Sequence, residues 1–376
     1  MDKKVSRRVA LGTVAVGIGG LAAAPYYISV LKGEDKFGKY NLSMADILLY
    51  RTDTWMGKAI RYLDKSEVSH AGLYLGGGIV GEALTKEGLT RQSIEKSSQD
   101  CEWVRVFRLK KELANMQQVL DTANMYLNQS NRYAYEQILL LAMVCSIRKL
   151  DLTNPLLRRI VYSAINNAAA LVRWMQSNGK QPMICSEFVY RSYDEAVPDK
   201  EDPYTLEIET PWAATARSRL RGRRRRKQNA PAAANIHPES LLGQLQAEPG
   251  GLPAALGPAK VRAAAAPPEV SDQELKALIE IYLAEQTGSP TKATEIRPAL
   301  PAVTMDDLRD AVAQFAIALH ETTAAGTKLG PGAFGKPDTR AAATPSETLQ
   351  EISADFVTPG DLWRSLSLKD TGLLKT

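Results

Sequence analysis

The sequence of 376 residues predicts an α+β protein, with one dense domain over residues 33–215 and a sparse tail over residues 216–376. Short apolar runs bounded by glycines occupy residues 40–110 and are typical of strands. Segments with apolar residues at helical spacing follow over residues 113–196. The composition then changes, because the tail holds 14 of the 20 prolines but only 5 of the 25 aromatic residues. Strands followed by helices favour the α+β class.

Four short segments are expected to be strands. Ile47–Tyr50 is a continuous apolar run, and Trp103–Phe107 alternates between apolar and other residues. His70–Leu75 and Ile79–Ala83 are apolar runs that are separated by the three glycines 76–78. Two apolar runs joined by a glycine turn predict a β-hairpin.

Four segments after residue 110 have the pattern of helices: Leu113–Gln129, Tyr135–Ile147, Leu156–Met175 and Cys185–Ala196. The third begins directly after Pro155, a residue that suits a first helical turn. The fourth is expected to end before Pro198.

The tail is expected to be mostly disordered. Ala230–Pro268 is rich in Ala, Pro and Gly, and such stretches bury too little apolar surface to offset the entropy of the chain. Ser271–Gln286 and Met305–His320 are predicted to form short amphipathic helices, each with a capping-box pattern at its start. We therefore expect residues 33–215 to fold without the tail.

Residues 1–32 have the pattern of a bacterial signal sequence or a membrane anchor. Four basic residues precede an uncharged stretch, Val9–Leu31, and Arg7 and Arg8 partly match a twin-arginine signal. The alternative is an ordinary buried helix. We expect an exported protein, either periplasmic or anchored with its main domain outside the cytoplasm.

Charge and cysteine content narrow the range of partners. The net charge is only +5, which does not favour a nucleic-acid-binding chain. Arg217–Lys227 carries eight basic residues and is either a solvated linker or a contact with anionic lipid or envelope polymer. Three cysteines without a CxxC pair, and only three histidines, predict no metal site.

Three residues have the chemistry of a thiol-dependent acyl transfer. Cys185 begins a predicted helix, where the positive end of the helix dipole favours the thiolate. His70 begins a predicted strand and is a candidate general base, and Glu82 in the next strand is a candidate to orient it. The alternatives are a small core cysteine, a surface histidine and a solvated glutamate. Cys101 and Cys145 are interpreted as ordinary packing residues.

Five ordered segments resemble the permuted papain-like amidases and cysteine peptidases of the YaeF/YiiX type, which are relatives of the NlpC-type hydrolases. Met44–Arg51 is similar to the opening strand of that family, Ser69–Tyr74 to its histidine strand and Val80–Ala83 to its glutamate strand. Tyr133–Glu136 resembles its tyrosine region, and Ile184–Val189 its nucleophile helix. The resemblance covers roughly residues 40–197.

The chain also departs from that family. Ala45 stands where Gly is usual, and Glu136 stands where Asp is usual. Leu139–Gly179 is longer and more helical than the family pattern, and is expected to form a lid or a pocket wall.

The resemblance implies a circularly permuted papain-like domain with an antiparallel sheet, and a cysteine amidase or peptidase with a Cys185–His70–Glu82 triad. Tyr133 and Tyr135 are implied to bind substrate, with aromatic packing as the alternative. No cofactor and no metal are implied, and the expected substrate is a cell-wall peptide or a lipid amide. Two other functions stay open. One is a lipid acyltransferase resembling lecithin–retinol acyltransferase, for which the apolar helices expected at residues 139–175 would suit a lipid-facing pocket. The other is a non-catalytic envelope-binding module.

Overall fold

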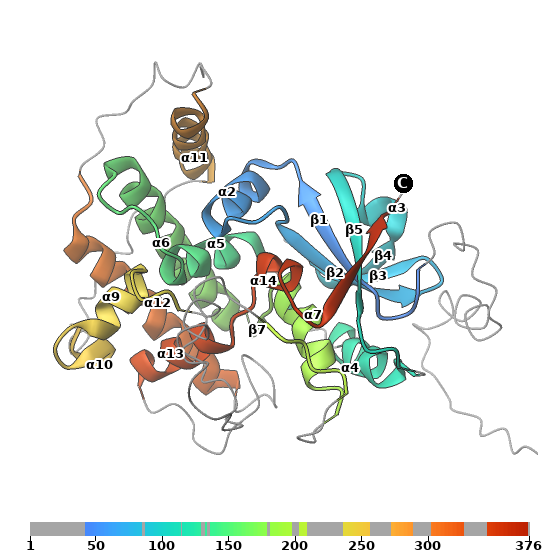
Figure 1. Cartoon of the computed structure of the whole chain (residues 1–376). Helices are drawn as coiled ribbons and strands as arrows, with labels where there is room; N and C mark the ends of the chain where they lie inside the picture. Colours follow the sequence, from blue (N-terminus) through green and yellow to red (C-terminus); the bar gives the residue numbers. More distant parts are fainter. Residues whose placement is uncertain are drawn as a thin grey trace, which may run out of the picture.

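The computed structural model describes eleven stretches of the chain: residues 42–84, 87–113, 115–128, 132–133, 136–178, 181–197, 203–208, 236–255, 272–288, 302–326 and 344–374. These stretches form two lobes that lie side by side (Figure 1). One of them, the sheet lobe, contains the antiparallel sheet and the helices that pack on it, and the other, the helical lobe, is a group of packed helices. The α+β class predicted from the sequence is confirmed.

The sheet has six strands in the order β4-β3-β2-β1-β5-β8, and each neighbouring pair is antiparallel. The strands are β1 (Ile47–Thr52), β2 (His70–Gly76), β3 (Ile79–Leu84), β4 (Gly88–Ser93), β5 (Cys101–Leu109) and β8 (Leu368–Leu373). The predicted hairpin is β2 and β3, and the glycines between them have positive φ angles. Glycine adopts these angles without the steric penalty that a Cβ would bring.

Side chains alternate between the two sides of the sheet, so each side has its own cluster. One side carries Leu49, Leu73 and Ala83 and packs against α4 (Gln117–Leu127) and α7 (Cys185–Asp194). The other side carries Leu48, Tyr50, Tyr74, Val80, Val104 and Val106 and packs against α3 (Ile94–Ser97). The two sides therefore offer different surroundings to a polar side chain.

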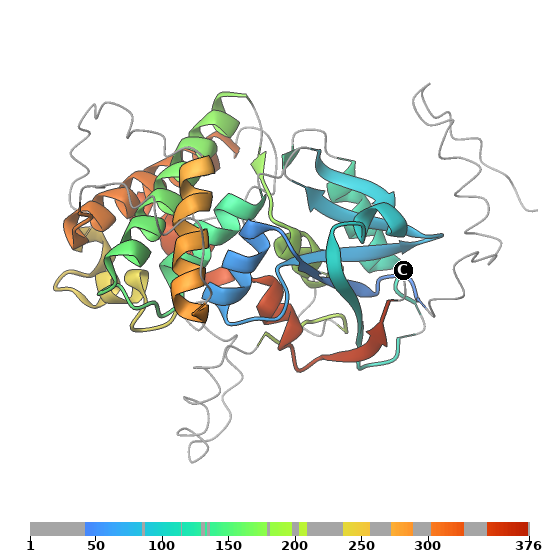
Figure 2. The same ribbon diagram turned by 90° about the horizontal axis from the view of Figure 1, so that it is seen from above.

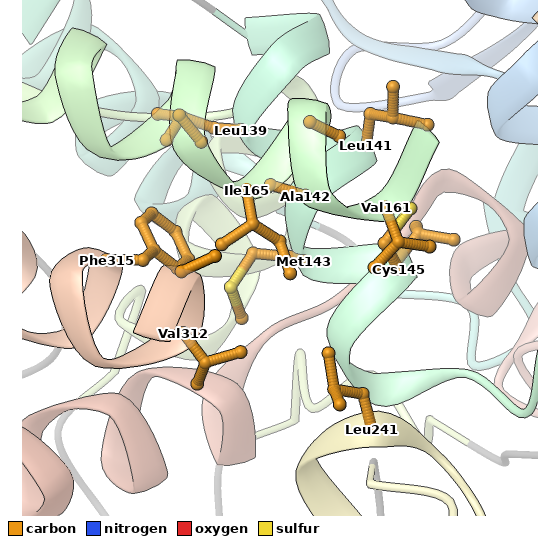
Figure 3. Packing of buried hydrophobic residues seen from close by; sticks show 14 of the residues in the cluster. Leu139, Leu141, Ala142, Met143, Cys145, Val161, Ile165, Leu241, Val312 and Phe315 are labelled. Atoms are coloured by element: carbon orange, nitrogen blue, oxygen red, sulfur yellow. The ribbon is translucent and has the colours of Figure 1, made fainter. Parts of the chain in front are cut away.

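The helical lobe is built around α5 (Glu136–Ile147), which is apolar on all sides. Such a helix is stable in water only when other elements cover it completely. It contacts α2 (Trp55–Asp64), α6 (Pro155–Ser177) and α9 (Leu241–Ala247), and α6 in turn contacts α11 (Asp272–Thr287) and α12 (Met305–Gly326). Figure 3 shows Leu141 and Met143 of α5 among side chains from α6, α9 and α12.

The prediction that residues 216–376 are mostly disordered is wrong for the four stretches of the tail that the structure describes. They form α9, α10 (Gly251–Ala255), α11, α12, α13 (Pro345–Asp355), α14 (Pro359–Trp363) and β8. The two predicted tail helices are confirmed as α11 and α12. The prediction judged the tail by its average composition, although apolar side chains of α12 such as Leu308 and Leu319 are buried against α6.

The expected domain boundary at residue 215 is also wrong, because residues after it pack on the domain before it. The end of the chain returns to the sheet, where β8 pairs with β5. Trp363 of α14 stacks near Phe107 of β5, with 5.2 Å between the ring centroids. Figures 1 and 2 both show this last segment (red) lying along the sheet. One fold therefore contains residues from both sides of that boundary.

The expectation that Leu139–Gly179 forms a lid or a pocket wall is also wrong for the described residues. The apolar side chains of α5 and α6 lie in the core of the helical lobe, covered by α9, α11 and α12. Within the described stretches, no helix combines the length and the hydropathy that crossing a membrane requires. The expected signal or anchor at residues 1–32 and the basic run Arg217–Lys227 lie outside the described residues.

Candidate active site

His70 and Glu82 form the polar centre of the sheet lobe. His70 begins β2 and Glu82 lies in the middle of β3, and Gly72 of β2 is the register partner of Glu82. This diagonal cross-strand placement brings His70 Nε2 to 2.8 Å from Glu82 Oε2. Both side chains are buried, and Glu82 is only 1 % exposed. Burial strengthens a hydrogen bond between such groups because little water competes for it.

Two further side chains surround this pair and were not identified from the sequence. The ring of Tyr50 lies 5.1 Å from the His70 ring, centroid to centroid, and its hydroxyl is hydrogen-bonded to Ser97. Gln92 of β4 donates from Nε2 to Glu82 Oε1. No pattern in the sequence singles out Tyr50 or Gln92 as a site residue, because their positions beside the pair depend on strand register.

Cys185 is the first residue of α7 and is fully buried. The helix packs closely on β3 at Gly81, where an added Cβ would lie 3.2 Å from Phe188 Cζ. Near the other end of α7, the Tyr193 hydroxyl donates to the carbonyl of Ala45. These contacts orient α7 along β2 and β3, with Cys185 toward the end of the sheet at which β2 begins and β3 finishes.

The first turn of α7 is held from the C-terminal segment. Ile184 occupies the N-cap position and has no side chain able to accept a hydrogen bond from the first N–H groups. The Ser186 hydroxyl donates to the carbonyl of Val357 at 2.7 Å. Glu187, which follows in the matched motif, pairs with Arg191 at 2.9 Å and is therefore engaged within the helix.

The histidine–glutamate pair and the body of α7 lie on different sides of the sheet. Side-chain alternation places His70 and Glu82 on the side of Tyr50 and Gln92. Cys185 belongs to the cluster on the α7 side. His70 is the first residue of β2 and Cys185 the first residue of α7. The Nε2 nitrogen of the His70 ring faces Glu82, and Nδ1 is its other ring nitrogen.

The other two cysteines have environments that disfavour a thiolate. Burial raises the pKa of Cys145 to about 12, and Cys145 lies in the apolar core of the helical lobe. Burial also raises the pKa of Cys101 to about 11, with a smaller opposing effect from the nearby His70. A thiol with such a pKa is protonated at neutral pH and is a poor nucleophile.

The two tyrosines expected to bind substrate are only partly described. The backbone of Tyr133 ends the short strand β6 (Arg132–Tyr133), which pairs in parallel with β7 (Gln181–Pro182). Since β7 leads into α7, the backbone of Tyr133 lies near the start of the cysteine helix. Tyr135 lies outside the described residues.

The comparisons with known proteins do not assign a family to this chain. No family model and no curated protein matches the chain. Among solved structures, the chain is similar to one described as the metalloprotein YiiX from Escherichia coli O157:H7, with 18 % identity over 42 % of this chain and 68 % of that one. The TM-score of 0.27 is too low to assign a family. Within the described stretches, no group of three or more His, Cys, Asp or Glu side chains is arranged to hold a metal ion.

Proposed function

We propose that the protein is a cysteine amidase or peptidase that hydrolyses an amide bond through Cys185, His70 and Glu82, on a circularly permuted papain-like domain. The observation that carries this proposal is the buried hydrogen bond between His70 Nε2 and Glu82 Oε2, at the end of the sheet where α7 begins with Cys185. A carboxylate bound to one ring nitrogen fixes the tautomer and leaves the other nitrogen to exchange a proton with the nucleophile.

The proposed reaction has two stages. The Cys185 thiol gives its proton to His70 Nδ1, and the sulfur attacks the carbonyl carbon of the substrate. The C–N bond then breaks, the amine leaves with the proton from His70, and the acyl group stays on Cys185 as a thioester. Water attacks the thioester, His70 takes a proton from the water, and the acid and the thiol are released. The N–H groups of the first turn of α7 are the nearest source of an oxyanion donor.

The substrate class and the location rest on the sequence. A cell-wall peptide or a lipid amide is the proposed substrate, because the pattern of residues 1–32 is that of an exported or anchored protein. The lipid acyltransferase alternative was favoured by apolar helices at residues 139–175, and these helices lie in the core of the helical lobe. That observation therefore no longer supports it.

The first test compares the alkylation rates of two cysteines and the turnover of variants at the proposed catalytic residues. Iodoacetamide should alkylate Cys185 faster than Cys145, as measured by peptide mass spectrometry over time. Cys185→Ala should abolish turnover of an amide substrate, and Cys145→Ala is the matched control. His70→Ala should lower the rate by about a hundredfold or more, the usual contribution of a general base. Glu82→Gln should cost less than His70→Ala, since an amide still accepts from the ring.

Two results would contradict the proposal. One is a Cys185→Ala variant that keeps wild-type turnover. The other is faster alkylation of Cys145 than of Cys185 in the folded protein.

A further inference from the structure

Gln92 lies on β4, an edge strand of the sheet, and reaches the side chain of Glu82 on the neighbouring strand. Each of the two carboxylate oxygens of Glu82 therefore has its own hydrogen-bond partner. Oε2 faces His70 Nε2, and Oε1 accepts from the Nε2 amide of Gln92. Both carboxylate oxygens of Glu82 are thus held by a hydrogen bond.

The orientation of the Gln92 amide is fixed by this contact. Rotating the amide by half a turn would place its oxygen against the carboxylate, and two acceptors would then repel each other. In the observed orientation, Gln92 Oε1 is buried and has no hydrogen-bond partner among the described residues. A buried carbonyl oxygen without a donor is unfavourable, so the contact of Nε2 with Glu82 outweighs this loss.

We propose that Gln92 is a positioning residue for the reaction, acting through Glu82 on His70. This inference rests on the proposed function, and it extends the triad by one residue that supplies a hydrogen-bond donor. The amide N–H stabilises the negative charge of Glu82 and fixes the direction of its second oxygen. Glu82 in turn stabilises the imidazolium that forms when His70 takes the proton of Cys185.

The direction of the expected effect follows from this chain of contacts. Without the Gln92 donor, the carboxylate of Glu82 loses the hydrogen bond that fixes its direction, and its support for the His70 imidazolium is weakened. The thiolate of Cys185 then forms only at higher pH. The acid limb of the rate–pH profile should therefore move to higher pH, while the rate on the plateau changes little.

The experiment measures the rate of Cys185 alkylation by iodoacetamide from pH 4 to pH 9 in the full chain. Gln92→Met keeps the length and volume of the side chain but removes its donor. At pH 6 we expect its rate to fall by about tenfold, the loss of one hydrogen bond to a charged group. Thr90→Val is the matched control, because Thr90 lies on the same strand directly opposite Glu82. Its profile should match that of the wild type.

Gln92→Lys provides a second test, in which the acid limb should not move to higher pH. The ammonium group keeps a donor for Glu82 and adds a positive charge, so the acid limb should lie at or below the wild-type position. Near-UV circular dichroism of each variant checks that the fold is retained.

The outcomes separate the two proposals. A pH-dependent rate at Cys185 in the wild type that is lost in His70→Ala supports the proposed function, whatever Gln92 does. If that holds and both Gln92 variants keep the wild-type acid limb, the role of Gln92 is overturned. If Gln92→Met lowers the rate equally at every pH, its effect is structural and the inference is likewise overturned.

Discussion

The two lobes differ in what their interiors contain. The helical lobe packs apolar side chains around a helix that is apolar on all sides (Figure 3), and buried polar residues there such as Ser146 and Asn166 donate to carbonyls of their own helices. The sheet lobe buries His70 and Glu82 between strands, with Tyr50 against the imidazole ring. Burying polar groups is costly unless they are hydrogen-bonded. The comparison indicates that the helical lobe supplies mainly apolar burial, while the sheet lobe buries the hydrogen-bonded pair of His70 and Glu82.

The lobes are joined by a buried ionic cluster. Arg148, just after α5, donates from Nε to Asp64 of α2 at 2.7 Å and from Nη2 to Asp361 of α14. Thr358, the N-cap of α14, donates to the second oxygen of Asp64 at 2.8 Å. Gly360 lies so close that an added Cβ would be 2.3 Å from Asp64 Oδ2. The cluster thus attaches the C-terminal segment to helices from the first half of the chain.

The largest expected effect comes from removing the tail. A chain of residues 33–215 lacks β8, α14 and the helices that cover α5 and α6. It would expose a large apolar surface and leave Arg148 without Asp361, so we expect it not to fold. Amide dispersion in a two-dimensional ¹H–¹⁵N NMR spectrum measures this.

A chain of residues 33–376 is the control, because it removes only residues outside the described structure. It should give a dispersed spectrum and a cooperative unfolding transition. A folded and thiol-active chain of residues 33–215 would show that the two halves are separable, contrary to the packing described above.

The strands and the long helices of the first half could be predicted from the sequence because their signals are local. Alternation and the glycine turn define β2 and β3, and Asn154 with Pro155 defines the start of α6. The resemblance implied that Glu82 lies beside His70, and the two side chains are in contact, but their roles in a reaction stay predictions. Position 185 at a helix start also follows from local pattern, whereas its catalytic role stays a prediction.

The missed features depend on contacts between distant parts of the chain. β8 has a mostly polar sequence with Gly372 near its end, and nothing local indicates that it pairs with β5. Gln92 gains its position from the register of β4 against β3. α2 was missed although Thr54 caps its start. The tail helices were judged by the composition between them, whereas their buried leucines and alanines decide the packing.

The second expected effect concerns the ionic link between the lobes. Asp361→Asn removes the charge that faces Arg148 in a site where both side chains are almost completely buried. Removing one member of a buried ion pair should lower the free energy of unfolding by about 3–5 kcal/mol. Urea unfolding followed by fluorescence measures it.

Asp370→Asn is the matched control. Asp370 lies on the same C-terminal segment as Asp361 and pairs with Arg105 of β5, but its side chain is about a third exposed. The loss there should stay within about 1 kcal/mol. Equal losses in the two variants would mean that the Arg148 cluster does not link the lobes as described.

The smallest expected effect is the response of this link to acid. Asp361 is buried, which by itself raises its pKa, but the guanidinium groups of Arg148 and Arg364 overcome this and hold the pKa below its usual value of 3.8. A carboxyl group of this kind stabilises the fold above its unfolded pKa, and the contribution is lost as the pH falls through the folded pKa. Asp64 has the opposite tendency, because burial raises its pKa despite Arg148, so it titrates first on acidification.

The difference in Tm between wild type and Asp361→Asn should therefore be constant from pH 7 to about 5 and should shrink below about pH 4. Scanning calorimetry at pH 7, 5, 4 and 3 measures this difference, and the same scans of Asp370→Asn should show a small difference at neutral pH. A difference for Asp361→Asn that is as large at pH 3 as at pH 7 would mean that the lost stability comes from packing of the side chain and not from its charge beside Arg148.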